Sequence, residues 1–425
     1  MEPMLKTRLA LVLGAALIAA AIAPYSAAEF SRGPSTAEPD PRAKPGAPAA
    51  VPQDAQHQVS VVNVEIPVRV YRGDAFVDSL GFKDFEVLDN GVPQTIEAIY
   101  LVRKTEIART EGKRGNAPQV SRQFVLFFEM TEFLPEINAT LDLFFDKVYL
   151  PGDSLMVVTP MNRYHLRDQA FAERPRAKIK EELRAKLLRD ILIGNSEYQS
   201  LIRTLNSSMV GSNSLEEKLQ LYSDTLARLE NMRRVNEKGL IEFAGLLKDL
   251  PGQKYVFLFY QKERIPSYDW KQLMQIMNAN QADAARTFKL MENFQMFNRD
   301  VDFDVEAIKR AYADSSISVN FLFLTRTLPE NADVSDDGAS GLKMVEQSAD
   351  VFSAFREVAA ATGGITDSSA NLTASFSRAV DASENYYLIY YKPRDYKADG
   401  TFHPLTVRVT SGNYRVSHRA GYIAR

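Results

Sequence analysis

The chain has 425 residues, a formal net charge of −3 and no cysteine. This length exceeds one ordinary hydrophobic core, so two or three domains are expected. The slightly negative net charge argues against nucleic-acid binding. The lack of cysteine excludes disulfides, thiol catalysis and zinc–thiolate sites.

The first residues have the features of a secretory signal. Lys6 and Arg8 precede an apolar and glycine run over residues 9–23, and Ser26-Ala27-Ala28 offers small residues for cleavage. This pattern predicts a signal peptide over residues 1–28, with an uncleaved N-terminal anchor as the alternative. No later apolar run approaches ~20 residues, so no transmembrane span is expected after cleavage. We therefore expect a periplasmic or extracellular protein.

Two segments of different character follow the signal. Residues 29–57 are rich in proline and alanine and predict a linker. Residues 58–118 predict an N-terminal β domain, because polar and apolar residues alternate and Asp89-Asn90-Gly91 is a strong hairpin turn. Within it, residues 104–118 are polar and charged, and we interpret them as a connecting segment.

Residues 119–384 alternate between predicted strands and helices, which is typical of an α/β domain. The predicted strands are continuous apolar runs, and such runs favour a parallel sheet covered on both faces. They lie at residues 124–128, 153–159, 254–260 and 317–324. Residues 385–425 add strands at 386–391 and 405–409, which we expect to complete the β domain.

A long helical segment is expected over residues 174–250. Two apolar stripes at helical spacing predict amphipathic helices that pack on the sheet or on each other. A coiled-coil contact with a partner is the alternative for the stripes, and self-assembly through residues 176–248 is an alternative for the segment. The stripes are Ile179, Leu183, Leu187 and Ile191, and Leu215, Leu219, Tyr222, Leu226 and Leu229.

The order of several short motifs resembles that of bacterial exported VWFA-related proteins. The motifs include Asp84-Phe85-Glu86-Val87, Leu150-Pro151-Gly152-Asp153, Pro251-Gly252-Gln253-Lys254 and Arg419-Ala420-Gly421-Tyr422. The resemblance covers roughly residues 58–425. It implies an α/β fold with a von Willebrand type A, Rossmann-like, mostly parallel sheet flanked by helices, plus a small β-sandwich-like domain.

The same resemblance implies a degenerate metal-ion-dependent adhesion site. Where the family has D-x-S-x-S after the first sheet strand, this chain has Glu129, Thr131 and Phe133, and Gln261-Lys262-Glu263 stands where the family has Asp-Gly. Phe133 has no oxygen ligand and Lys262 adds a positive charge, so we expect no divalent metal or other cofactor. A working metal site is the alternative. Without metal, we expect Thr131 to cap the following helix.

Two other acidic clusters are weaker metal candidates. Asp333-Val334-Ser335-Asp336-Asp337-Gly338 resembles the first half of an EF-hand loop, but Met344 stands where the bidentate glutamate is needed. Asp300, Asp302 and Asp304 precede a helix and are expected to cap it and complement its dipole.

The sequence contains none of the common catalytic motifs. We therefore expect no enzyme but an exported protein-interaction, adhesion-like module that binds an unidentified protein. Because α/β sheets bind at the carboxyl ends of their strands, the candidate partner-binding residues are Glu129, Thr131, Glu132, Gln261 and Glu263. Two alternatives remain, a metal-dependent adhesion module and a hydrolase that uses Glu129 and Glu132.

Overall fold

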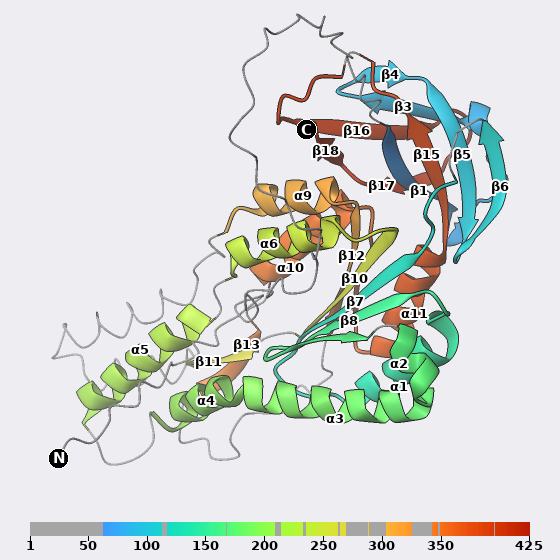
Figure 1. Cartoon of the computed structure of the whole chain (residues 1–425). Coiled ribbons are helices and arrows are strands. Elements are labelled where there is room, and N and C mark those ends of the chain that lie inside the picture. Colours follow the sequence, from blue (N-terminus) through green and yellow to red (C-terminus); the bar gives the residue numbers. More distant parts are fainter. Residues whose placement is uncertain are drawn as a thin grey trace, which may run out of the picture.

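The computed structural model describes residues 63–112, 117–166, 168–208, 214–232, 235–261, 264–268, 288, 303–324, 342–346, 349–394 and 396–425. The predicted signal peptide and linker lie outside these residues, as do Asp300, Asp302 and the EF-hand-like loop at 333–338. Figure 1 shows the central strands β7, β8, β10 and β12 between two layers of helices, with curved antiparallel strands at one end of the molecule.

The central sheet has six strands in the order β14-β12-β10-β7-β8-β9. Its first five strands pair in parallel, and β9 runs antiparallel to β8. The four strands predicted from continuous apolar runs are confirmed as β7, β8, β10 and β12. The bounds are β7 Arg122–Glu129, β8 Ser154–Val158, β9 Arg163–Leu166, β10 Gln253–Gln261, β12 Ile317–Leu324 and β14 Thr366–Ser369.

Helices cover both faces of this sheet. One face packs against α1 (Glu136–Leu143), the π-helical turn η2 (Phe144–Val148), α2 (Asp168–Glu173), α3 (Arg176–Gly194) and α11 (Leu372–Glu384). The other face packs against α6 (Glu237–Lys248), α9 (Val305–Asp314) and α10 (Ala349–Ala361). Each face thus has its own apolar core, which explains why these strands are apolar without alternation.

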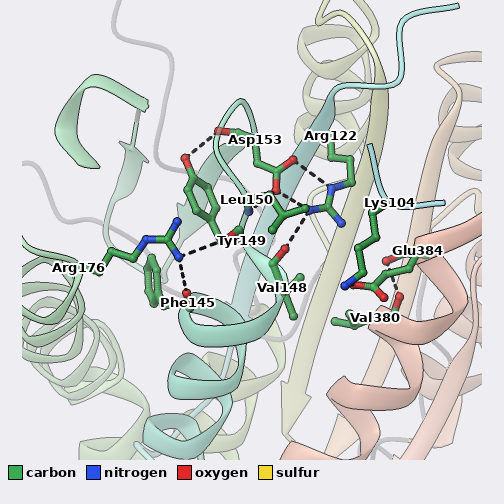
Figure 2. A network of polar contacts seen from close by, with 11 residues as sticks. Lys104, Arg122, Phe145, Val148, Tyr149, Leu150, Asp153, Arg176, Val380 and Glu384 are labelled. Atoms are coloured by element: carbon green, nitrogen blue, oxygen red, sulfur yellow. Dashed lines mark hydrogen bonds and ion pairs between the residues drawn. The ribbon is translucent and has the colours of Figure 1, made fainter. Parts of the chain in front are cut away.

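The N-terminal end of β7 is fixed by a buried ion pair. The Arg122 guanidinium donates through Nη2 to Asp153 Oδ2 at 2.6 Å and through Nε to Oδ1 at 3.0 Å, and neither side chain is exposed. Arg122 also donates to the carbonyl of Val148, and Asp153 accepts from the backbone of Leu150 (Figure 2). The pair therefore joins β7, the end of η2 and the start of β8.

The α3 stripe and part of the second stripe are buried as the packing interpretation predicted. Ile179, Leu183, Leu187 and Ile191 are buried on α3, and three of them belong to the sheet core. Helix α4 (Ser196–Ser208) packs against α5 (Leu215–Met232) through a separate apolar cluster that includes Tyr222, Leu226 and Leu229. No helix in the described part of the chain combines the length and apolarity needed to cross a bilayer.

The strands at the two ends of the described chain interleave in two antiparallel sheets. One has the order β17-β1-β15-β5-β6, with β2 beside β1, and the other has the order β18-β16-β3-β4; they share one core. A short pair, β11 (Arg264–Tyr268) and β13 (Leu342–Glu346), lies apart. The remaining bounds are β1 Val64–Arg72, β2 Ala75–Phe76, η1 Phe82–Asp84, β3 Phe85–Asp89, β4 Val92–Gln94, β5 Ile96–Arg103, β6 Glu106–Gly112, β15 Asn385–Tyr391, β16 Phe402–Val409, β17 Arg415–His418 and β18 Gly421–Ile423.

The predicted fold class, a von Willebrand type A, Rossmann-like, mostly parallel sheet with a small β-sandwich-like addition, is wrong. Ten of the fourteen strand pairings among the described residues are antiparallel. The central sheet is itself mixed, and an antiparallel sheet matches it in strand number. The prediction relied on continuous apolar runs, but antiparallel strands such as β6 and β16 have many exposed residues. Strand β15 also pairs with β1 and β5, which lie about 300 residues earlier in the sequence.

Two local predictions in the antiparallel part have opposite outcomes. The hairpin turn is confirmed: Asn90 and Gly91 have φ of 50° and 77° between β3 and β4, the left-handed backbone that this turn requires. The connecting segment predicted at 104–118 is wrong for residues 106–112, which form β6. Every second residue of β6 is exposed, so this edge strand has too little apolar character to be recognised in the sequence.

Candidate functional site

The predicted site lies where the order of the central sheet reverses. From β7 the chain continues to β8 on one side, and from β10 it continues to β12 on the other. Strands β7 and β10 are parallel neighbours, with Glu129 opposite Tyr260, so their carboxyl ends meet at one edge of the sheet. Such a reversal is the usual place for a ligand crevice in open α/β sheets.

Gln261 ties the two strand ends together. Its side-chain Oε1 accepts a hydrogen bond from the backbone N–H of Thr131 at 3.2 Å and another from that of Glu132 at 3.0 Å. Gln261 is buried, while Glu129, Thr131 and Glu132 are half-buried. The structure thus brings together Gln261, Thr131 and Glu132 as predicted for one site, whereas Glu263 lies outside the described residues.

Two side-chain amides that sequence reasoning missed also bind this loop. Asn195, between α3 and α4, donates through Nδ2 to the carbonyl of Met130 at 2.8 Å. Gln199 on α4 donates through Nε2 to the carbonyl of Thr131 at 3.4 Å. Nothing in the spacing of the predicted helical segment 174–250 showed that the chain at Asn195 and Gln199 reaches this loop.

The expected capping role of Thr131 is wrong. Helix α1 begins at Glu136 with Pro135 at its N-cap and no side-chain cap. The loop after β7 is long enough to place Thr131 against Gln261 instead, and Phe133 packs partly buried against the sheet core. Asp304, by contrast, caps α9 as predicted, because its carboxylate accepts from the backbone of Ala307 at 2.9 Å.

The oxygen atoms at this site form no recognisable metal centre. Among the described residues, no group of three or more histidine, cysteine, aspartate or glutamate side chains could hold a metal ion. The position of the second serine in the adhesion motif is held by Phe133, which packs into the core. The backbone N–H groups of the loop are engaged by an uncharged amide, Gln261. A metal-dependent mechanism therefore has no support from this geometry.

The buried carboxylate of Asp190 holds the C-terminal part of α3 against the β8–β9 hairpin. Asp190 accepts hydrogen bonds from Tyr164 on β9 at 2.6 Å, and from Asn162 at 2.9 Å and Thr159 at 3.0 Å in the β8–β9 connection. Burial raises the pKa of Asp190, but these hydrogen bonds and one from Arg189 outweigh it and hold the pKa below its usual value. Asp190 is thus stabilised as a carboxylate and acts as a structural anchor for α3.

Beside this anchored end, α3 presents apolar side chains to solvent. Leu188, Leu192 and Ile193 are 42%, 57% and 50% exposed, on the last two turns before Asn195. Three exposed large apolar side chains within six consecutive positions are unusual, because such residues are normally scattered singly. We call these three residues and the loop 129–132 the α3 edge.

Comparisons with known proteins do not identify the chain. No protein-family model matches it, and no curated protein matches it significantly. A search of solved structures returns the crystal structure of the human COPII-coat protein Sec24c, at 10% identity and a TM-score of 0.25. That match covers 74% of this chain and 45% of the Sec24c chain, and at such a low TM-score it supports no inference about fold or function.

Proposed function

We propose that this chain is an exported, non-enzymatic module that binds a protein partner, without a divalent metal, through the α3 edge. The observation that carries the proposal is the group of exposed apolar side chains Leu188, Leu192 and Ile193 on the last two turns of α3, a helix whose end is tied to the loop through Asn195. Closely spaced, exposed large apolar side chains favour burial against a partner. Export is supported by the signal-like features of residues 1–28.

The anchoring of the surface supports binding by a preformed site. The loop is held by amides from β10, from α4 and from the α3–α4 junction, and α3 is held by Asp190. A surface that is already ordered loses little conformational entropy when a partner binds, so more of its contact energy appears as affinity. This argument applies to a partner that contacts α3 and the loop together.

The two alternative functions from the sequence have less support. A hydrolase would need Glu129 and Glu132 to converge on a pocket with one raised pKa. Glu132 instead follows Thr131 in a loop whose backbone is held by Gln261. A metal-dependent adhesion module would need oxygen ligands where Phe133 packs into the core. No specific observation favours either alternative.

Site-specific photo-crosslinking in cells that make the full chain tests the proposal. The photoreactive residue p-benzoylphenylalanine replaces Leu192 in one variant and Leu246 in a matched control. Leu246 is 56% exposed on α6, so its exposure equals that of Leu192 within a percentage point while it lies outside the α3 edge. We expect a single adduct of defined mass at position 192, none at position 246, and no change with EDTA.

Other results would overturn the proposal. Equal adducts at both positions, or none at position 192, would contradict docking at the α3 edge. An adduct of twice the chain mass would replace a foreign partner with self-assembly through residues 176–248. Loss of the adduct in EDTA and its return with Mg²⁺ would restore the metal-dependent alternative.

A further inference from the structure

A polar pocket of about 520 Å³ lies where strands of the two antiparallel sheets meet the central sheet. Its walls come from β1, β15 and β18 on one side and from α6 and β10 on the other. The pocket lies at the start of β10, near Lys254, whereas the loop of the α3 edge contacts Gln261 at the opposite end of that strand, and the pocket plays no part in the proposed function. The charged side chains that line it are Glu65, Lys248, Lys254, Arg419 and Arg425.

Two of the four cations in this lining already have a carboxylate partner. Asp314 Oδ2 lies 2.6 Å from Lys248 Nζ and 3.1 Å from Arg425 Nη2. The Glu65 carboxylate accepts hydrogen bonds from Gln253 Nε2 at 2.7 Å and from the Tyr390 hydroxyl. Among the described residues, neither carboxylate forms an ion pair with Lys254 or Arg419.

Lys254 and Arg419 are the two remaining cations, and both are only 7% exposed. Arg419 donates to the carbonyl of Glu65 at 2.7 Å and to the hydroxyl of Ser316 at 2.8 Å, both uncharged acceptors, and its buried Nε has no hydrogen-bond partner among the described residues. Lys254 donates to the carbonyls of Lys248 and Ser315. In the described part of the chain, neither cation lies within 4.0 Å of a carboxylate.

Burying a cation without an opposite charge costs free energy, and burying two such cations beside one pocket costs more. Burial lowers the pKa of Lys254, although the charge of Glu65 opposes this shift. Side chains that line the pocket carry four positive charges against one negative charge, with Asp314 behind them. Even with a carboxylate at the main-chain end of Arg425 counted as well, positive charge remains in excess.

The backbone at the pocket is also unusual. Ser316, which lines the pocket and accepts from Arg419, has a φ of 53°, a left-handed conformation that costs free energy in a non-glycine residue. This conformation turns the chain between α9 and β12 and holds the Ser316 hydroxyl against the guanidinium. Arg419 is therefore held in a fixed position, which suits recognition of a planar or tetrahedral oxyanion.

We propose that this pocket binds a small ligand bearing an oxyanion, a carboxylate or a phosphate, between Lys254 and Arg419. The Lys254 ammonium supplies a charge-assisted hydrogen bond, the Arg419 guanidinium adds a second positive charge at the pocket wall, and the bound anion offsets this buried positive charge. The alternative is a purely structural role, in which both cations only join the antiparallel sheet to the central sheet through backbone carbonyls.

Titration calorimetry and thermal melting of the full chain at pH 7 test this proposal. The probes are inorganic phosphate and succinate, with ionic strength held constant by NaCl. We expect saturable heat and a melting temperature that rises with probe concentration, because an anion bound only by the folded state stabilises it. Stronger binding of phosphate would indicate a phosphomonoester ligand, and stronger binding of succinate a carboxylate ligand.

Matched variants separate binding from structure. Lys254→Met is expected to weaken probe binding at least about tenfold, the effect of one charge-assisted hydrogen bond. Lys238→Met is the control, because Lys238 lies on α6 outside the pocket with its side chain 87% exposed. Arg419→Lys keeps the charge but loses the planar fork, and should weaken binding while the chain still folds.

Three outcomes would overturn the proposal. The first is the absence of saturable heat up to about 10 mM of either probe, the range of very weak affinity. The second is equal affinity in the wild type and Lys254→Met. The third is a probe-induced shift in melting temperature that is the same for the wild type, Lys254→Met and Arg419→Lys, which would leave only the structural role.

Discussion

At the scale of single residues, the pair Arg122–Asp153 shows how a buried charge defines a structure. Both side chains are fully buried, and the Arg122 guanidinium also lies 4.9 Å from the Phe124 ring centroid. One nitrogen, Nη1, has no hydrogen-bond partner among the described residues. Since ion pairs inside a core repay their desolvation only in good geometry, removing one partner should cost much more than removing both.

We expect Arg122→Met and Asp153→Asn each to lower the free energy of unfolding by about 3–5 kcal/mol, because each leaves the other charged side chain buried without its ionic partner. The double variant should lose less than the sum of the two single losses, since no charge is then left unpaired and the introduced asparagine still accepts from the Leu150 backbone. Urea unfolding of all four proteins measures this coupling. Strict additivity would show that the two side chains do not act as a pair.

His418, also a single residue, makes the stability of the fold depend on pH. Its Nε2 accepts from the backbone of Val407 at 3.1 Å, which places the proton on Nδ1, near the carbonyl of Arg419. Burial lowers the pKa of His418, the Arg419 carbonyl opposes this shift, and the Arg419 charge reinforces it. The folded state therefore keeps His418 neutral at a pH where the unfolded chain, with a pKa of about 6.5, takes up a proton.

It follows that stability should fall as the pH drops below about 6.5, down to the folded-state pKa of His418. Replacing His418→Gln should flatten the decline in unfolding free energy between about pH 7 and pH 5. The control is His165→Gln, because His165 is exposed on β9. If the two variants show the same pH dependence as the wild type, His418 does not set this slope.

At the scale of elements, the loop after β7 depends on Gln261 from a different strand. Gln261→Ala should free the amides of Thr131 and Glu132, so their hydrogen exchange should quicken by about tenfold, the value of one hydrogen bond. Gln199→Ala is the matched control, since it removes a bond to the Thr131 carbonyl and leaves those two amides bound. Unchanged exchange at both amides in Gln261→Ala would mean that other contacts hold the loop.

The sequence predicted an element correctly where a single continuous segment contained the whole pattern. The apolar runs predicted β7, β8, β10 and β12, and the stripe on α3 predicted its buried face. Gln261 was placed at the site because it follows a strand. Asn195 and Gln199 could not be found, since their role depends on where α3 ends in space, and β6 was missed because half of its residues face solvent.

At the scale of the whole molecule, the two ends of the described chain depend on each other. Strand β15 lies between β1 and β5, with Ile389 opposite both Ile66 and Ile99. All three isoleucines are buried in one core with residues of β3, β16 and β18. The N-terminal strands consequently lack a central neighbour until residues 385–391 are present, so the antiparallel part should fold late and as one unit with the C-terminal segment.

Removal of residues 385–425 should therefore unfold β1–β6 while leaving the chain otherwise intact. We expect limited proteolysis to cleave within residues 64–112 of the shortened chain, because β1 and β5 then expose apolar faces and unpaired backbone groups. Ile389→Val is the control in the full chain: it should cost about 0.5–1.5 kcal/mol and preserve resistance to cleavage. Resistance of residues 64–112 in the shortened chain would show that the N-terminal strands form a stable sheet alone, and that interleaving is not what holds them.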